Sequence, residues 1–264
     1  MAATVTTASS DQDELVRLLR EAIHLGAALI VLPELAFAEN GVVADLREGV
    51  ESGAALVSAL RLELTNTTAI AVISIVEETL EGFAHTAIAF SAVGEVLRQR
   101  ALHPSARHPW ATVLTSELSH ADTAIGRLAL LPGEDTLYPE AFRLAALRDV
   151  EIVACPMHVV EQWETRTGLP ERAAENRFSV VAASRRTPAG ASLIATVGED
   201  FTLWTVWKNR PFDGNINYPI LTKAVADGVT TATIYPANAG NRTVTQKTDV
   251  VDSRPFRLLG PMVN

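Results

Sequence analysis

Cysteine is nearly absent from this chain of 264 residues, because Cys155 is the single one. One cysteine excludes an internal disulfide framework and any metal site built from several thiolates. Long apolar runs are also lacking, so no stretch of about twenty residues is available to span a membrane. No glycine-rich phosphate loop of the G-x-G-x-x-G kind follows a predicted strand. The sequence therefore predicts neither a disulfide scaffold, nor a membrane-spanning protein, nor a glycine-rich phosphate site.

Basic residues are outnumbered by acidic ones, 22 against 31, and the net charge is −9. Nucleic acids and anionic membranes bind basic surfaces, so neither is an expected partner. Residues 1–11 lack the basic and apolar regions of a signal peptide, which predicts a cytoplasmic location. With 48% hydrophobic residues, a chain of this length can bury the core of one large domain. We expect a single domain over residues 1–264, with 204–264 as its C-terminal extension.

Apolar periodicity and turn residues predict alternating helices and strands, which indicates an α/β fold. The expected helices are 15–25, 53–64, 141–147, 170–176 and 221–226. The expected strands are 27–32, 69–76, 84–90, 151–154, 180–184, 191–197 and 230–235, with a short or frayed strand at 2–7.

The most informative segment runs from Leu128 to Glu140. An apolar run predicts a buried strand, Pro132-Gly133 ends it, and Pro139 begins a helical pattern. The segment resembles the nucleophile turn of the nitrilase superfamily, the carbon-nitrogen hydrolases. In this resemblance Asp135 and Tyr138 match the acidic and aromatic positions, while Gly133 stands at the position of the catalytic cysteine. Glycine has no side chain that can attack a substrate.

Two further segments resemble the same family. Residues 27–35 form an apolar strand that ends in Pro-Glu, which places Glu34 at the position of the general base. Residues 172–184 are similar to the Arg-Ala-x-Glu-Asn helix that runs into a core strand. The resemblance implies a four-layer α-β-β-α sandwich of the nitrilase type. It also implies a C-terminal tail that crosses to a partner subunit, and hence a homodimer or a subunit of a larger assembly.

The family's third catalytic block is a lysine within the pattern Tyr-Arg-Lys-x-His-Leu. The corresponding segment, Gly94 to Pro104, contains no lysine. Alignment on the downstream residues places Arg100 at the lysine position, whereas counting from Gly94 places Leu102 there. Arginine keeps a positive charge but is a planar fork that does not donate a proton at neutral pH. Of the thiolate, carboxylate and ammonium that such hydrolysis requires, only the carboxylate of Glu34 remains.

Other candidate residues surround this degenerate set. Cys155 follows the predicted strand 151–154 and is the alternative nucleophile, although a lone cysteine is usually a buried apolar residue. A basic cluster that includes Arg98 and Arg100 could receive a carboxylate or phosphate, or could be an exposed loop. The predicted ligand-binding residues are His103, Arg107, His108, Trp110, Glu134 and Asp135. No metal site or cofactor is predicted, because His103 and His108 lie five residues apart in a proline-containing loop without a second ligand cluster.

Three hypotheses follow. In the first, the protein has lost thiol-dependent C–N hydrolysis and is a binding, regulatory or scaffolding subunit with an open pocket lined by Glu34, Arg100 and the Gly133 turn. Its expected ligand is a small carboxylate or amide. In the second, it is an active amidase or nitrilase whose nucleophile is Cys155 or a water activated by Glu34. In the third, it is a working enzyme altered at Gly133, which the missing lysine argues against. We predict the first.

Overall fold

The computed structural model describes residues 1–198, 218–240, 242–245 and 248–253. Residues 204–217 and 254–264 of the predicted C-terminal extension lie outside these ranges. In the described part of the chain, no helix is both long enough and apolar enough to cross a membrane.

The described residues form four α-helices, two of which begin at a side-chain cap. Asp11 accepts the Glu14 N–H at 2.9 Å and begins the first helix, and Asp45 accepts two N–H groups at the start of the second. The second helix therefore begins earlier than the predicted residue 53. Pro139 occupies the first turn of the third helix. The helices are α1 (Gln12–His24), α2 (Leu46–Glu63), α3 (Pro139–Leu147) and α4 (Leu169–Asn176). Short turns of helix are η1 (Glu39–Gly41), η2 (Gly133–Leu137), η3 (Glu164–Gly168) and η4 (Pro236–Gly240).

The strands form two mixed six-stranded sheets. The first has the order β12-β1-β2-β3-β4-β5, and the second has the order β11-β10-β9-β8-β7-β6. Strands of the first sheet are β1 (Ala2–Thr6), β2 (Leu29–Val31), β3 (Ile70–Thr79), β4 (Gly82–Ser91), β5 (Gly94–Arg100) and β12 (Gly228–Ala232). Strands of the second are β6 (His120–Thr123), β7 (Gly126–Leu130), β8 (Ile152–Pro156), β9 (Ser179–Ala183), β10 (Leu193–Thr196) and β11 (Ile220–Lys223). A separate ribbon joins β13 (Thr243–Thr245) and β14 (Thr248–Asp249).

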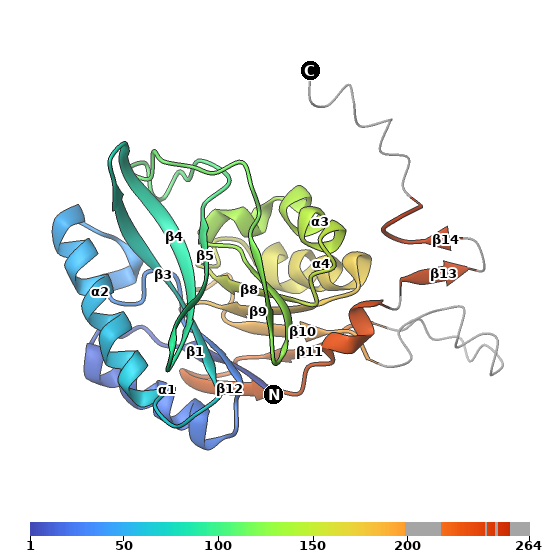
Figure 1. Cartoon of the computed structure of the whole chain (residues 1–264), viewed down its shortest axis with the longest axis horizontal. Coiled ribbons are helices and arrows are strands. Elements are labelled where there is room, and N and C mark those ends of the chain that lie inside the picture. Colours follow the sequence, from blue (N-terminus) through green and yellow to red (C-terminus); the bar gives the residue numbers. More distant parts are fainter. Residues whose placement is uncertain (199–217, 241, 246–247, 254–264) are drawn as a thin grey trace.

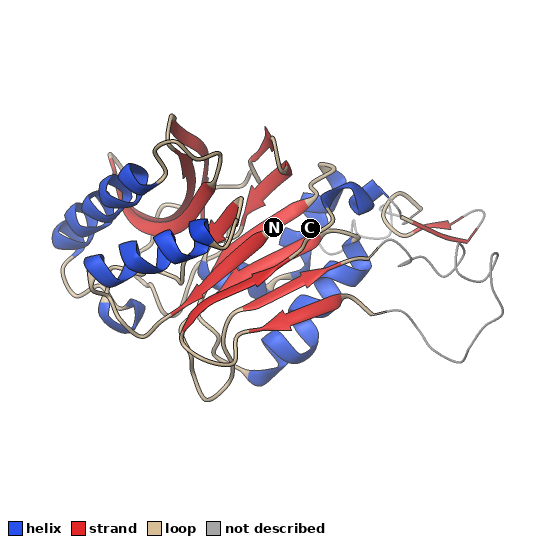
Figure 2. Ribbon diagram, turned by 90° about the horizontal axis from the view of Figure 1, so that it is seen from below, coloured by secondary structure: helices blue, strands red, loops and turns tan. Residues whose placement is uncertain are grey.

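Helices cover the outer face of each sheet, with α1 and α2 on one side of the strands and α3 and α4 on the other (Figure 1). The view from below shows the strands between the two helical layers (Figure 2). Side chains alternate between the faces of each strand. On β8, Ile152 and Ala154 pack between the sheets, whereas Val153 and Cys155 pack against the layer of α3 and α4. This arrangement confirms the predicted α/β fold, with two sheets between outer helical layers.

Parallel strands bring three chain segments to one edge of the two sheets. β2 runs parallel to β1 and β3, and β8 runs parallel to β7 and β9. The residues after β2 and β7 therefore leave their sheets near the end of β8. The Leu131 N–H donates to Ala154 O at 3.0 Å, and the Glu34 N–H donates to Met157 O at 3.2 Å. These bonds place Glu34 and Gly133 next to each other although they belong to different sheets.

Two predicted elements differ from the structure. Residues 221–226 do not form a helix, because residues 220–223 pair antiparallel with β10 as strand β11. Ile220, Leu221 and Thr222 favour an extended strand over a short helix. The N-terminal strand is not frayed, since β1 is buried along its whole length between β2 and β12.

Candidate functional site

Glu34 lies in a sharp loop after β2 and is fully buried. A buried guanidinium, that of Arg185, holds this loop. Arg185 Nη1 donates to the Glu34 carbonyl at 2.5 Å, and Nη2 donates to the carbonyls of Leu35, Ala36 and Ala38 at 2.7–3.2 Å. Leu35 takes a left-handed conformation, with φ of +40°, which is uncommon for a residue with a side chain. The loop is therefore fixed by hydrogen bonds from Arg185, which follows β9, and by the Leu35 N–H, which donates to Ser74 Oγ at 2.9 Å.

The carboxylate of Glu34 faces positive charge. Arg107 Nη1 forms an ion pair with Oε2, and His108 Nε2 lies 3.2 Å from Oε1. Burial alone would raise the pKa of Glu34, but the contacts with His108 and Arg107 outweigh burial and hold the pKa below its ordinary value. Glu34 is therefore ionised at neutral pH. A carboxylate stabilised in this way is a weak proton acceptor.

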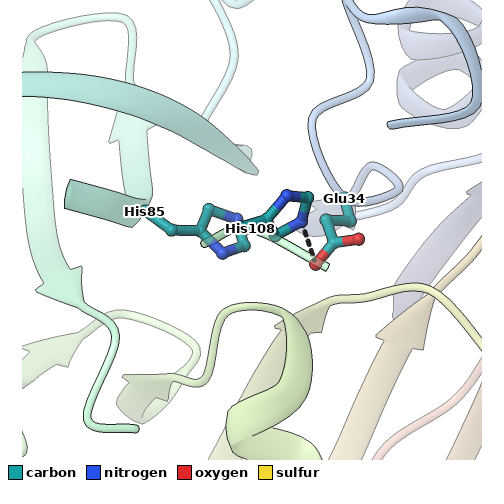
Figure 3. A group of neighbouring side chains, drawn as sticks. All are labelled: Glu34, His85 and His108. Carbon is teal, nitrogen blue, oxygen red and sulfur yellow. Dashed lines mark ion pairs between the residues drawn. The ribbon is translucent and has the colours of Figure 1, made fainter. Parts of the chain in front are cut away.

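Two histidines from different segments meet at this carboxylate. His85 projects from β4, and His108 comes from the loop between β5 and β6; their ring centroids are 4.9 Å apart (Figure 3). Trp110 lies beside both rings, with centroid distances of 6.2 Å to His85 and 5.4 Å to His108. Burial lowers the pKa of His85 to about 4, so its imidazole is neutral at pH 7. The cluster thus contains neutral donors and acceptors beside a charged pair.

Gly133 faces the same cluster from the turn after β7. Its φ is +53°, and it begins η2. A Cβ atom added at Gly133 would overlap Oε1 of Glu34 and would lie 2.9 Å from Cε1 of His85. The space that a nucleophilic side chain would occupy is therefore filled by Glu34 and His85.

Several polar atoms of this cluster lack a hydrogen-bond partner. They are Oε1 of Glu34, Nε2 of His85, and both ring nitrogens of His108. Nε2 of His108 and Oε1 of Glu34 nevertheless face each other at 3.2 Å as an ion pair. Glu34, His85 and His108 each offer one ligand atom, and these three atoms lie within 4.8 Å of one another. This is the one donor set for a metal ion in the described part of the chain.

The structure does not bring Arg100 to this site. Its guanidinium binds Glu77 through two hydrogen bonds of 3.0 Å, and Arg98 binds Glu95 and Glu77. Arg100 ends β5 on the face that carries Glu77 of β3, so it pairs within the sheet. Leu102, which the other alignment places at the lysine position, is partly buried and packs against the core of the second sheet. The expected pocket lining is therefore wrong at Arg100, and the positive charge at Glu34 comes from Arg107.

Three of the predicted ligand-binding residues instead hold the loop after β5 in place. Asp135 accepts the N–H groups of Leu102 and His103 at 2.9 and 3.0 Å, and lies 2.9 Å from Nδ1 of His103. The His103 ring stacks on Tyr138 at 3.7 Å. Glu134 accepts the Ala106 N–H at 2.9 Å. These contacts tie the loop after β5 to the Gly133 turn, and they carry Arg107, His108 and Trp110 to Glu34.

Cys155 lies on the wrong face of its strand for catalysis. Its side chain packs in the core under α3 and α4 and is fully buried. Burial raises the pKa of the thiol, and the charge of Asp135 raises it further. A reactive thiol needs the opposite environment. The alternative nucleophile predicted from the sequence is therefore not part of the site.

Two important residues were not predicted from the sequence, His85 and Arg185. The signal for His85 was present, because it is a polar residue inside the predicted apolar strand 84–90. Arg185 directly follows the predicted strand 180–184, at the sheet edge where the site lies. To predict that these two residues belong to the site, it is necessary to know which strands lie next to each other at this edge.

Comparisons with known proteins agree with the fold. The carbon-nitrogen hydrolase family model matches residues 2–206, more than half of the chain. No curated protein is similar enough in sequence to count as a relative. The structure of an amidase from Nesterenkonia sp. superimposes with a TM-score of 0.65 and 21% identity, covering 73% of this chain and 81% of the amidase.

Two variants of the amidase from Nesterenkonia sp. AN1 are similar as well. A double mutant in complex with acrylamide gives a TM-score of 0.69 at 18% identity, over 97% of this chain and 94% of the amidase. Another mutant shows covalent addition of the acetamide moiety of fluoroacetamide at the active-site cysteine. Its structure superimposes with a TM-score of 0.64 at 22% identity, over 73% of this chain and 81% of the amidase. At these identities the likeness establishes the fold. With the family match over residues 2–206, it follows that the chain belongs to the carbon-nitrogen hydrolase family of the nitrilase superfamily.

Proposed function

We propose that this protein does not cleave C–N bonds through a thiol, and that it acts as a binding or regulatory protein for a small amide or carboxylate. The observation that supports this proposal is the filled space at Gly133. Covalent catalysis needs a nucleophile within hydrogen-bond reach of its base. Beside Glu34 there is a glycine whose added Cβ would overlap the carboxylate itself.

The state of Glu34 also supports a non-hydrolytic role. The carboxylate is paired with Arg107, and its lowered pKa leaves little tendency to take a proton from water at neutral pH. Loss of one oxyanion donor costs on the order of a hundredfold or more in rate, and here the family's ammonium is missing as well as the thiol.

Arg107 is the part of the cluster that meets solvent. Its side chain is 21% exposed, whereas those of Glu34 and His108 are 1% exposed. A small polar ligand that approaches the cluster meets this guanidinium first. Arginine offers several N–H donors, which suit the carbonyl oxygen of an amide or the oxygens of a carboxylate.

A second candidate function is hydrolysis by water without a covalent intermediate. It is favoured by the amidase structures that share the fold and by the retention of Glu34 at the end of β2. This candidate requires that a ligand or metal ion release Glu34 from Arg107. It predicts turnover that disappears in Glu34→Gln.

The two candidates are separated by intact-mass measurement and ammonia release. Native protein is incubated with fluoroacetamide, which labels the cysteine of the amidase variant described above, and separately with a series of small amides. We expect no adduct and no ammonia. Iodoacetamide added to urea-unfolded protein is the positive control, because it labels the exposed Cys155. An adduct on native protein, or ammonia release that Glu34→Gln abolishes, would overturn the proposal.

Binding is measured by the thermal midpoint, which rises when a ligand binds the folded state alone. We expect one of the small amides or carboxylates to raise it, and Arg107→Met to weaken the effect. Arg98→Met is the matched control, since Arg98 pairs with Glu95 on the exposed side of β5. No shift with any member of the series would contradict the binding role.

A further inference from the structure

We propose that Glu34, His85 and His108 form a binding site for a divalent first-row transition metal ion of the Zn²⁺ type. The inference goes beyond the proposed function, because it concerns the donor atoms themselves and holds whether or not the protein binds an amide. Two imidazoles and one carboxylate, all buried, offer ligand atoms that lie within 4.8 Å of one another.

The unpartnered atoms are an independent observation that points to a ligand. Buried polar atoms are nearly always hydrogen-bonded, because an unpaired buried donor or acceptor destabilises the fold. Four such atoms converge on one small region: Oε1 of Glu34, Nε2 of His85 and both ring nitrogens of His108. A metal ion bound to Oε1 and to one nitrogen from each ring would satisfy three of these groups at once.

The distances fit a metal ion after small side-chain movements. Nitrogen and carboxylate ligands bind Zn²⁺ at roughly 2.0–2.2 Å, so two tetrahedral ligands lie roughly 3.3 Å apart. Nε2 of His108 and Oε1 of Glu34 are already 3.2 Å apart. The ligand atom of His85 lies within 4.8 Å of the other two, and Figure 3 shows the His85 ring beside that of His108.

The kind of metal follows from the ligand atoms. Imidazole suits Zn²⁺, Fe²⁺, Ni²⁺ and Cu²⁺, whereas Mg²⁺ and Ca²⁺ prefer oxygen ligands alone. Three protein ligands leave a coordination position for a further group, as in zinc sites that exchange ligands.

Gly133 explains why this set can assemble here. An added Cβ would overlap Glu34 and crowd His85, so a side chain at this position would separate two of the three ligands. The absence of a side chain at Gly133 therefore allows Glu34 and His85 to lie close together.

Arg107 is the competitor for this site. It binds Oε2 of Glu34, while the proposed ligand atom is Oε1. A guanidinium and a divalent ion attract the same carboxylate and repel each other. Because the Arg107 side chain already reaches solvent, it can move outward when a metal ion binds. Removal of Arg107 should therefore tighten metal binding.

The test uses the full chain after dialysis against EDTA, with Co²⁺ as the probe. Binding to nitrogen and oxygen ligands of low symmetry gives a visible absorption band, which requires no assumption about activity. We expect a saturable band at one Co²⁺ per chain that Zn²⁺ displaces, and Zn²⁺ should raise the thermal midpoint. The absence of a saturable band would overturn the proposal, and would indicate that bound water is the partner of the unpaired atoms.

Variants assign the ligands. His85→Ala and His108→Ala should each weaken Co²⁺ binding by more than about a hundredfold, because changes in the outer shell of metal sites already cost about 10–100-fold. Arg107→Met should strengthen binding by about tenfold or more. His120→Ala is the matched control, since His120 lies on β6 outside the cluster, and it should leave binding unchanged. Equal affinities in all four variants would overturn the assignment. The failure of metal binding would leave the adduct and ammonia measurements unaffected.

Discussion

A methyl group at Gly133 should destabilise the protein more than a methyl group at any open glycine turn. The first contribution is conformational, because φ of +53° lies in the left-handed region, where a side chain costs about 1–2 kcal/mol. The second is steric, because the new Cβ would overlap Oε1 of Glu34 and lie 2.9 Å from His85. Overpacking of a close-packed site costs about 1–3 kcal/mol. We therefore expect Gly133→Ala to lower the free energy of unfolding by about 2–5 kcal/mol.

The assay is urea unfolding followed by tryptophan fluorescence, read as a change in midpoint at constant slope. Gly94→Ala is the matched control. Gly94 also has a positive φ, +148°, but an added Cβ there meets no described atom within 4 Å. The control therefore contains backbone strain without the overlap.

The overlap with Glu34 has a signature of its own. Replacing Glu34 by alanine removes the atom that the new Cβ would meet, so the effects of Gly133→Ala and Glu34→Ala should not add. The double mutant should be more stable than the sum of the two losses by more than about 0.5 kcal/mol, the usual limit for independent sites. If Gly133→Ala were no worse than Gly94→Ala, or if the cycle were additive, the filled space at Gly133 would be refuted as the reason for the missing nucleophile.

Three further predictions concern residues around the site. Cys155 should react with a disulfide reagent only as fast as the protein unfolds, and rapid labelling of native protein would contradict its core position. Because the pKa of the folded thiol is raised, the free energy of unfolding should fall as pH rises above about 8.5, where the unfolded thiol ionises. Arg185→Met should lower the free energy of unfolding by about 3–5 kcal/mol, because four carbonyl groups lose their donor. Arg20→Met, at an exposed ion pair, should leave the urea midpoint nearly unchanged, and equal midpoints for the two variants would refute the anchoring role. Burial alone would raise the pKa of Glu77, but its hydrogen bonds lower it, so its contribution is present above the ordinary value of about 4.3 and is lost as pH falls through the folded pKa. Glu77→Gln should therefore flatten the acid side of the stability profile, and an unchanged profile would show that these bonds contribute nothing.

The fold was predictable because local signals and the family pattern agree. The strand before Gly133, the break at Pro132 and the helix from Pro139 follow from apolar periodicity and proline, and the structure has all three. The helix expected at 221–226 fails for a tertiary reason, since pairing with β10 decides the conformation of a short apolar segment. The burial of β1 is also tertiary, because β12 comes from the far end of the chain.

The sequence predicted Glu34, Gly133 and the loop residues Arg107 and His108 as site residues, but it did not predict His85, which lies within β4. Glu34 and Gly133 lie three residues after β2 and β7, and the parallel pairing of these strands brings the segments that follow them to one edge. The choice between Arg100 and Arg107 depends on the path of the loop after β5, which has no periodicity. That path is set by backbone contacts to Glu134 and Asp135, which sequence analysis had assigned to ligand binding.

The proposed loss of thiol chemistry predicts that replacing Gly133 by cysteine and Arg100 by lysine will not by itself give a hydrolase. A cysteine at position 133 would still place its Cβ against Glu34 and His85. A lysine at position 100 would extend toward Glu77, the partner that Arg100 now binds, and not toward Glu34. Arg107 would continue to hold the carboxylate that must accept a proton. On the proposed function, hydrolysis through a thiol would therefore require changes at Gly133, His85 and Arg107 together.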